Sequence, residues 1–256
     1  MFRVCSPGTP TCRQAGNTYI NMGRLEDAKK ELRKYADKEK AQVLRGFFKT
    51  GLGEYGEGDV FLGVTVPFIR KVVKEFGDLK LLDLLKLLRS KIHEERLLAL
   101  LILVQQFNQA NLKTKKKIYK AYLAKTKFIN NWDLVDLSAP QIVGGFLIDK
   151  DRRVLRKLAQ SPLLWERRIA ILATFTFIKT IDFDVVFIIT KLLLSDNEVL
   201  IHKACGWMLR EAGKRNLRKE EDFLRKNYKV MPRTMLRYAI ERFLEDRRKK
   251  ILETKW

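Results

Sequence analysis

The sequence predicts an all-α fold, an α-solenoid of helical repeats, and three observations support this class. Apolar residues recur at helical spacing through most of the chain, and almost no stretch alternates as a half-buried strand would. Short segments with Gly, Pro, Ser or Asn interrupt the helical pattern. Similar helices also recur about every 35 residues, which is the period of arrays built from helix pairs.

Residues 1–21 do not share this pattern. They contain Gly, Pro, Ser and Thr, carry no acidic residue, and lack the continuous apolar core of a signal peptide. We expect a disordered extension, which is either an upstream in-frame addition before a start at Met22 or a basic arm. Residues 22–256 are then predicted to form a single repeat domain.

Two stretches of the first hundred residues need separate explanations. The glycine-rich segment Gly51–Asp59 has no strand before it and no Lys-Ser/Thr after it, which disfavours a nucleotide-binding loop. We predict a turn-rich connection that leads into a helix with Pro67 at its start. The most apolar stretch, Arg96–Phe107, is shorter than the ~18–20 residues of a membrane span, so we predict a buried helix and no membrane partner.

The repeat is visible when the starts of similar helices are aligned. Each start has a polar or basic position just ahead of an apolar run, and the markers are Arg96, Trp132, Arg168, Lys203 and Arg237. Equivalent positions of successive repeats converge on one concave face of a solenoid. We therefore expect the last three markers to form one basic surface, with Trp132 in its middle.

The composition indicates the kind of partner. The chain has 52 Lys and Arg against 30 Asp and Glu, a formal net charge of +22 and a pI near 10.0. Such an excess is typical of proteins that bind a polyanion, such as nucleic acid or an anionic surface. The alternative is a surface of solvated charges without a binding role.

Cysteine and histidine are too few for several kinds of site. The three cysteines, Cys5, Cys12 and Cys205, form neither a disulfide framework nor a zinc-ligand pattern. With only His93 and His202, a histidine-based metal site or a Ser-His-Asp triad is disfavoured. These counts favour a reducing, cytoplasmic location and a protein without a metal.

One group of residues combines chemistry that a structural helix does not need. Trp132 and Asp136 are four residues apart, so they share one helical face. Arg168 belongs to the next repeat, and Trp207 and Arg210 share a face of the following one. Asp133, near the start of its helix, suits the helix dipole and is predicted to be structural.

These motifs resemble those of the AlkD-like DNA alkylation-repair glycosylases, a family of HEAT-like repeat proteins. The resemblance covers roughly Leu44 to Phe243, and its motifs are "YGEGDVFLGVTVPFIR", "NNWDLVDLSAP", "WERRIAIL" and "HKACGWMLREAGKRN". It implies a concave basic groove and monofunctional hydrolysis of the N-glycosidic bond of cationic N3- or N7-alkylated purines. It further implies a monomer that acts on double-stranded DNA in base excision repair, without a metal or another cofactor.

The resemblance also assigns roles to residues. The family's catalytic aspartate matches Asp136, its groove tryptophans match Trp132 and Trp207, and its groove arginines match Arg168 and Arg210. An aromatic residue from the N-terminal helical region also lines the groove in the family, and the candidates here are Phe47, Phe48 and Tyr55.

The predicted chemistry agrees with these residue types. Cleavage of an N-glycosidic bond develops positive charge on the sugar, which the carboxylate of Asp136 would stabilise. Indole faces suit a cationic base or an electron-poor sugar. The groove arginines, together with Lys203, Arg233 and Arg237, are predicted to hold phosphates. The alternative interpretation is that Asp136 only forms a structural ion pair with a neighbouring Lys or Arg.

Two other functions remain open from the sequence alone. The first is a non-catalytic HEAT-like module that binds damaged or branched DNA, and the second is a protein–protein scaffold. An enzyme requires Asp136, whereas a binding module tolerates its loss.

Overall fold

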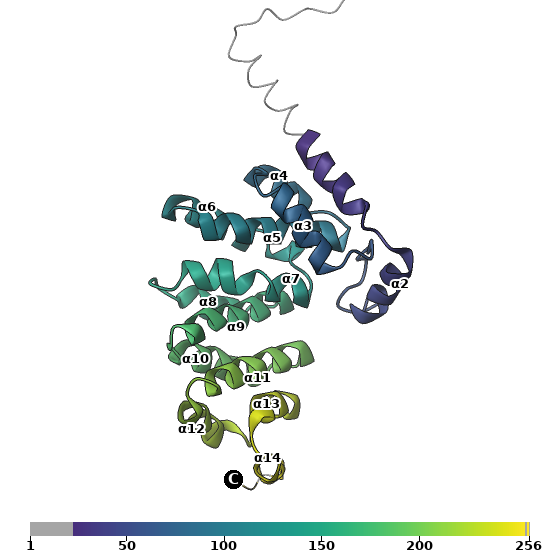
Figure 1. Cartoon of the computed structure of the whole chain (residues 1–256). Coiled ribbons are helices and arrows are strands. Elements are labelled where there is room, and N and C mark those ends of the chain that lie inside the picture. The colour runs from purple at the N-terminus through teal and green to yellow at the C-terminus, as the bar shows by residue number, and fades with distance from the viewer. Residues whose placement is uncertain (1–22, 254, 256) are drawn as a thin grey trace, which may run out of the picture. The chain divides into compact units, whose positions relative to one another are not determined.

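The computed structural model describes residues 23–253 and residue 255 (Figure 1). Within these residues the chain forms helices and turns, with one isolated β-bridge between Val60 and Ile92 and no strand. The predicted all-α class is therefore confirmed. The extension predicted for residues 1–21 and the start predicted at Met22 lie outside the described residues.

The contacts divide the chain into two compact parts, one ending at Gln106 and one beginning at Phe107. The first part contains a helix at residues 23–33, α2 (Lys38–Phe47), α3 (Val66–Glu75), α4 (Leu81–Leu87) and most of α5 (His93–Gln109). The second part contains α6 (Leu112–Leu123), η1 (Thr126–Phe128), α7 (Trp132–Asp136), η2 (Pro140–Gly144), α8 (Arg153–Ala159), α9 (Leu164–Lys179), α10 (Asp184–Leu192), α11 (Val199–Gly213), α12 (Leu217–Asn227), α13 (Arg233–Ala239), η3 (Ile240–Arg242) and α14 (Glu245–Leu252).

In the first part, a buried acidic side chain fixes the turn before α3. The carboxylate of Glu94 on α5 accepts hydrogen bonds from the backbone N–H groups of Leu62, Gly63 and Val64. Gly63 has a φ of +82°, and a Cβ there would lie 2.0 Å from a carbonyl oxygen, so only glycine fits. Pro67 lies in the first turn of α3, as the sequence predicts.

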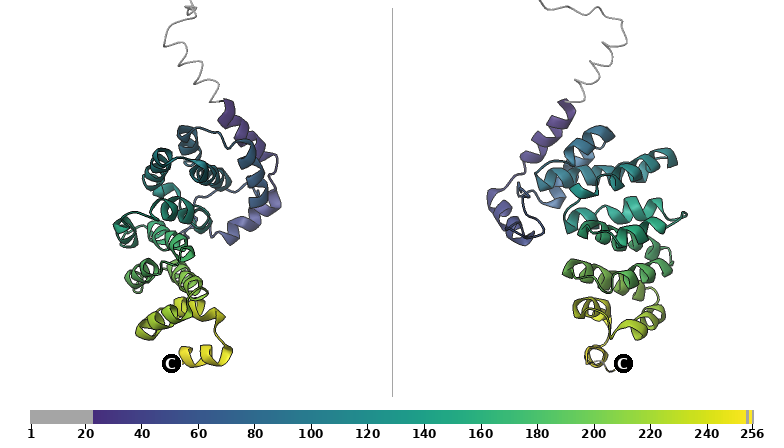
Figure 2. Two further views of the ribbon diagram at one scale, coloured as in Figure 1. Left: turned by 60° about the vertical axis from the view of Figure 1, so that its left-hand side comes forward. Right: turned by 180° about the vertical axis from the view of Figure 1, so that it is seen from behind.

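The helices of the second part lie in two rows (Figures 1 and 2). In the inner row, α9 packs against α7, α11 against α9, and α13 against α11. The outer row contains α6, α8, α10 and α12; here α8 and α10 pack on α9, and α12 packs on α11. The markers Trp132, Arg168, Lys203 and Arg237 all lie on inner-row helices, so the repeat predicted from the sequence is present.

The inner row is held together by close helix contacts. Residues 169–174 of α9 are all buried, as expected for a helix packed on several sides. A Cβ at Gly144 would lie 2.4 Å from the carbonyl oxygen of Ala173, and one at Gly206 would lie 2.4 Å from that of Met235. Glycine at these two positions therefore lets neighbouring inner helices touch. No helix of the described residues is long and apolar enough to cross a membrane.

Candidate active site

The short helix α7 carries Trp132 at its first position and Asp136 at its last. Asn131 caps the helix, and its side chain accepts a hydrogen bond from the backbone N–H of Trp132 at 2.8 Å. Asp133 is buried in the first turn, and its carboxylate accepts from the backbone N–H of Leu134 at 2.8 Å. This local hydrogen bond holds the side chain of Asp133 in the first turn of its own helix.

A buried hydroxyl pair fixes the other end of α7. The Ser138 hydroxyl donates to the carbonyl of Leu134, and the phenol oxygen of Tyr122 lies 2.8 Å from the same hydroxyl. Tyr122, on α6, is fully buried, and burial raises the pKa of its phenol. The phenol therefore stays neutral and links α7 to the outer row.

The segment after α7 is a π-helix, a wide turn that is often found near functional sites. The Thr176 hydroxyl on α9 donates to the carbonyl of Pro140. Gly144, at the end of this turn, packs directly on the α9 backbone. The chain on both sides of Asp136 is thereby fixed to its neighbours, so the carboxylate sits on a rigid support.

Asp136 forms a two-point ion pair with Arg168 on α9. Arg168 Nε lies 2.8 Å from Asp136 Oδ1, and Nη2 lies 2.8 Å from Oδ2. The Arg168 side chain is 6% exposed and that of Asp136 is 14% exposed. A planar guanidinium holds both carboxylate oxygens in one plane, which a single-point contact with lysine does not do.

The third nitrogen of Arg168 is also occupied, because Nη1 donates to the carbonyl of Leu200 on α11 at 2.6 Å. Arg168 thus connects three consecutive inner helices. The sequence analysis expected Arg168, Lys203 and Arg237 to form one basic surface, and Arg168 does not belong to it. Arg168 is buried, because the ion pair with Asp136 and the hydrogen bond to the Leu200 carbonyl hold its guanidinium inside the protein.

The environment of Asp136 changes its acidity. Burial raises the pKa of Asp136 above its ordinary value, and Asp133 adds to the increase. The charge and hydrogen bonds of Arg168 oppose it. The result is a carboxylate that remains partly open to solvent and takes up a proton more readily than an exposed aspartate.

Trp207 and Arg210 lie three residues apart on α11. Trp207 is half-buried, with its ring centroid 6.2 Å from that of Phe175 on α9. Arg210 pairs with Glu241, while its Nε is buried without a hydrogen-bond partner. Arg210 also lines a pocket of about 340 Å³, and the buried residue Glu220 is another of its lining residues.

The remaining predicted phosphate-binding residues are on the surface. Lys203 on α11 and Arg233 and Arg237 on α13 are all exposed. Arg233 donates to the carbonyl of Leu252 at 2.5 Å. We use the name inner face for a set of inner-row residues that are not buried, namely Trp132, Lys203, Trp207 and Arg237.

The aromatic candidates of the first part have different environments. Phe48 is buried and stacks on Phe61, with centroids 5.2 Å apart, so it belongs to the core of that part. Phe47 is 60% exposed and Tyr55 is half-buried. Among the described residues, no group of three or more His, Cys, Asp or Glu side chains is arranged to hold a metal ion.

Three residues that matter in the structure were not predicted. Tyr122 and Ser138 carry no sequence signal beyond helical spacing, because their hydrogen bond joins segments 16 residues apart. Glu220 lies in the charged stretch "LRKEEDFLRK", which suggests a solvated helix, yet it is 2% exposed.

Comparisons with known proteins agree with this architecture. A family model described as "DNA alkylation repair enzyme" matches residues 28–243. A solved structure described as a predicted DNA alkylation repair enzyme from Enterococcus faecalis superimposes with a TM-score of 0.63 at 17% sequence identity, over 82% of this chain and 97% of that chain. At this identity the likeness supports the fold alone, and the comparison with curated proteins gave no match. Because the family match covers most of the sequence, including every residue of the site described above, the chain belongs to the DNA alkylation repair enzyme family.

Proposed function

We propose that the protein is a monofunctional DNA glycosylase that hydrolyses the N-glycosidic bond of cationic N3- or N7-alkylated purines in duplex DNA. The observation that carries the proposal is the Asp136–Arg168 pair, a rigidly held and partly solvent-accessible carboxylate on the same short helix as Trp132 in a basic protein. Family membership supports a role in DNA alkylation repair.

In the proposed reaction, the bond between C1′ of the deoxyribose and the base nitrogen breaks, and its electron pair leaves with the base. A cationic base becomes neutral as it departs, which makes it a good leaving group. Positive charge develops on the sugar, and the Asp136 carboxylate stabilises it. Water then adds to C1′, and its proton passes to Asp136 or to solvent.

Arg168 acts on Asp136 in this mechanism rather than on a phosphate. Each carboxylate oxygen has two lone pairs, and Arg168 occupies one on each oxygen. The other lone pairs remain available for the sugar cation or for the attacking water. Arg168 is thus a positioning residue, while Trp132 and Trp207 would line the cationic base and sugar.

DNA would be held mainly by its phosphates. Lys203 and Arg237 are exposed cations on the inner face, and Arg210 and Arg233 extend the set toward the C-terminal helices. Such contacts position a duplex without reading its sequence. Salt therefore weakens binding to lesion-bearing and undamaged duplexes alike.

The residues also favour a particular range of substrates. Enzymes that remove neutral damaged bases read the base edge with hydrogen bonds in a snug pocket. The proposed site supplies indoles, a carboxylate and guanidiniums, and none of the residues assigned to it is Asn, Gln or His. We expect release of 3-methyladenine and 7-methylguanine, and no release of uracil, hypoxanthine or 8-oxoguanine.

The test is to incubate the protein with methylated genomic DNA and to identify the released bases by mass spectrometry. Release of 3-methyladenine or 7-methylguanine, without strand cleavage, is the expected result. Tight binding of methylated DNA with no base released would instead identify a non-catalytic damage-binding module. Efficient release of uracil from a duplex would contradict the proposed mechanism, because removal of an uncharged base requires hydrogen bonds to the base edge that the assigned residues are not expected to make.

A further inference from the structure

A second basic surface lies on the outer row, away from Asp136. On α6, Lys113, Lys116, Lys117 and Lys120 are all exposed. Their spacing of three and four residues places them on one side of the helix. None of the four lies within 4.0 Å of a carboxylate oxygen in residues 23–253 and 255. Such like-charge neighbours destabilise a helix unless an anion compensates them.

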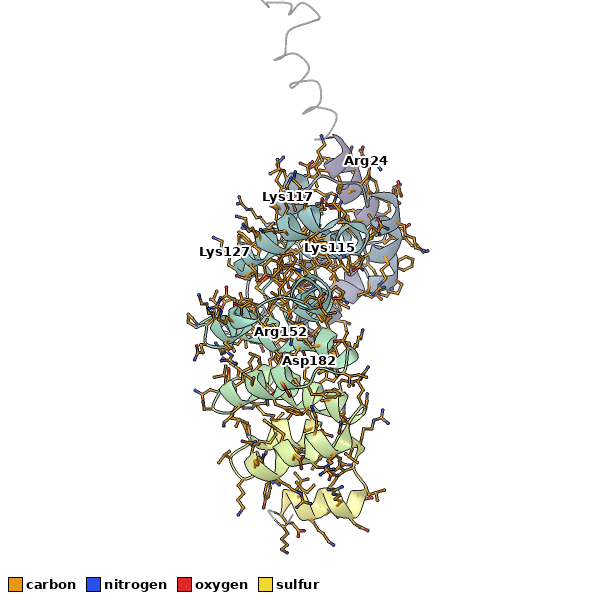
Figure 3. The ribbon with its side chains drawn as sticks, turned by 90° about the vertical axis from the view of Figure 1, so that its left-hand side faces the viewer. Arg24, Lys115, Lys117, Lys127, Arg152 and Asp182 are labelled. Carbon is orange, nitrogen blue, oxygen red and sulfur yellow. The ribbon has the colours of Figure 1, made fainter. Side chains whose placement is uncertain are left out.

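The next outer helix continues this surface. On α8, Arg153, Arg156 and Lys157 are exposed and share the same spacing, and Lys150 is exposed just before the helix. A pocket of about 530 Å³ lies beside this second set, and it is lined by Lys150, Asp151, Arg153 and Lys157 and, from α6, by Tyr119. Figure 3 views this side of the molecule, with Lys115, Lys117 and Lys127 labelled.

The excess of positive charge is found on α6 and α8, whereas the segments that contain α10 and α12 together carry no such excess. Residues 111–127 contain seven lysines and no acidic residue, and residues 148–160 contain five cations and two acids. By contrast, the outer segments 184–198 and 217–229 together contain six cations and six acids. A generally basic composition would not produce this difference between neighbouring helices.

We propose that this surface, which we call the outer lysine face (Lys113, Lys116, Lys117, Lys120, Lys150, Arg156 and Lys157), binds the phosphate backbone of duplex DNA, separately from the inner face. Lys113 and Lys120 are about 10 Å apart along the helix axis. This length corresponds to roughly three successive phosphates of one strand. Long lysine side chains follow a phosphate backbone without reading bases.

An anionic membrane is the competing polyanion, and the structure favours DNA. Helices that lie on membranes combine basic residues with exposed large apolar side chains that enter the lipid. On α6 and α8 of the described chain, Leu112 is the one large apolar residue that is exposed, and it lies at the end of α6. The outer lysine face therefore offers charge without an inserting apolar edge.

The experiment measures how many short undamaged duplexes bind to each chain at low salt, by analytical ultracentrifugation. The outer variant changes Lys113, Lys116, Lys117 and Lys120 to Gln. The matched control removes the same charge from the rest of the outer row by changing Lys191, Arg218, Lys226 and Lys229 to Gln; these are also exposed. A third variant, Lys203→Gln with Arg237→Gln, changes the inner face.

We expect two duplexes on the parent and on the control, and one on the outer variant. The salt dependence of the outer site in the parent should have a slope of about 6, because seven cations contact phosphates, and the four substituted lysines account for about 3 to 4 of it. Base release by the outer variant, at saturating DNA, should equal that of the parent.

Other results separate this proposal from the proposed function. If the parent binds one duplex and only the outer variant loses it, the proposal that the outer lysine face binds DNA is supported. The proposed binding of DNA at the inner face is then wrong. If only the inner-face variant loses a duplex, or if the control loses as much as the outer variant, the proposal is wrong. Flotation with phosphatidylserine vesicles that depends on the four lysines, with unchanged duplex binding, would identify a membrane surface instead.

Discussion

Replacing Arg168 with Lys would keep the positive charge beside Asp136 while removing the planar fork. Arg168 makes two hydrogen bonds to Asp136 and one to the Leu200 carbonyl. A lysine ammonium reaches one of these partners well, since it is a single charged point on a flexible chain. The substitution therefore separates the charge of Arg168 from its geometry.

The expected loss of stability follows from burial. The Arg168 side chain is 6% exposed, so its partners are not replaced readily by water. A buried acceptor left without a donor costs about 1–3 kcal/mol, and the weakened contact to Asp136 adds to this. We expect Arg168→Lys to lower the free energy of unfolding by about 2–4 kcal/mol, and Arg168→Gln by roughly 3–5 kcal/mol, because the latter leaves Asp136 without a countercharge.

The neighbouring residue provides a matched control. Arg167 also forms a two-point pair, with Asp196, and donates to the carbonyls of Ser161 and Pro162. Arg167→Lys should therefore lower the free energy of unfolding, measured by urea denaturation, by a similar amount. It should leave base release unchanged, because Asp136 keeps its partner.

The pH dependence of base release shows whether Arg168 positions Asp136 for catalysis or only stabilises the fold. With the pairing weakened, the pKa of Asp136 rises further, so Arg168→Lys should lose activity at a higher pH than the parent on the acid side. The reasoning would be refuted if Arg168→Lys changed the free energy of unfolding by less than ~0.5 kcal/mol, as a surface substitution does. Equal pH profiles for Arg168→Lys and Arg167→Lys would refute it as well.

Three further predictions concern charge. Lys203→Gln and Arg237→Gln should each reduce the slope of duplex affinity against salt at the inner face by about one unit, measured by fluorescence anisotropy; a loss for one DNA sequence only would indicate base reading. Base release by the parent should fall on the acid side at a pH above the ~3.9 of a free aspartate, because the pKa of Asp136 is raised and its ionised form is required; an acid limb at or below that value would contradict this. Burial raises the pKa of Glu220 to about 8, so the folded state holds a proton that the unfolded state releases near pH ~4.3, and stability falls as pH rises between these values. The free energy of unfolding of Glu220→Gln should therefore rise relative to that of the parent between pH 5 and 8, by up to ~1.4 kcal/mol per pH unit. Asp222→Asn, at an exposed position, should show no such rise. If the free energy of unfolding of both variants ran parallel to that of the parent over this pH range, the raised pKa of Glu220 would be refuted.

The sequence contained enough information to predict the inner row. Helix pairs that pack only on their neighbours impose a repeat on the chain, and the markers Trp132, Arg168, Lys203 and Arg237 follow it. Trp132 and Asp136 could be placed on one face because helical spacing is local. The position of Pro67 in the first turn of α3 could be predicted for the same reason.

What the sequence did not reveal depends on contacts between helices. Arg168 and Lys203 occupy equivalent repeat positions, yet one is buried in an ion pair and the other is exposed. Glu220 is buried beside Gly213, where any side chain would collide with its carboxylate. Spacing along a helix gives the direction of a side chain, but whether a partner lies there is decided by another segment.

The most direct test of the central claim is single-turnover release of 7-methylguanine by Asp136→Asn. The matched control is Asp133→Asn on the same helix, whose amide oxygen can still accept the hydrogen bond from Leu134. Thermal unfolding confirms that both variants fold, and duplex affinity is measured in parallel. We predict that Asp136→Asn releases the base at least ~100-fold more slowly while binding DNA as well as the parent or slightly better, because the positioned negative charge is lost. Near-parental release by Asp136→Asn, or an equal loss in Asp133→Asn with both proteins folded, would contradict the assignment of Asp136 as the catalytic residue.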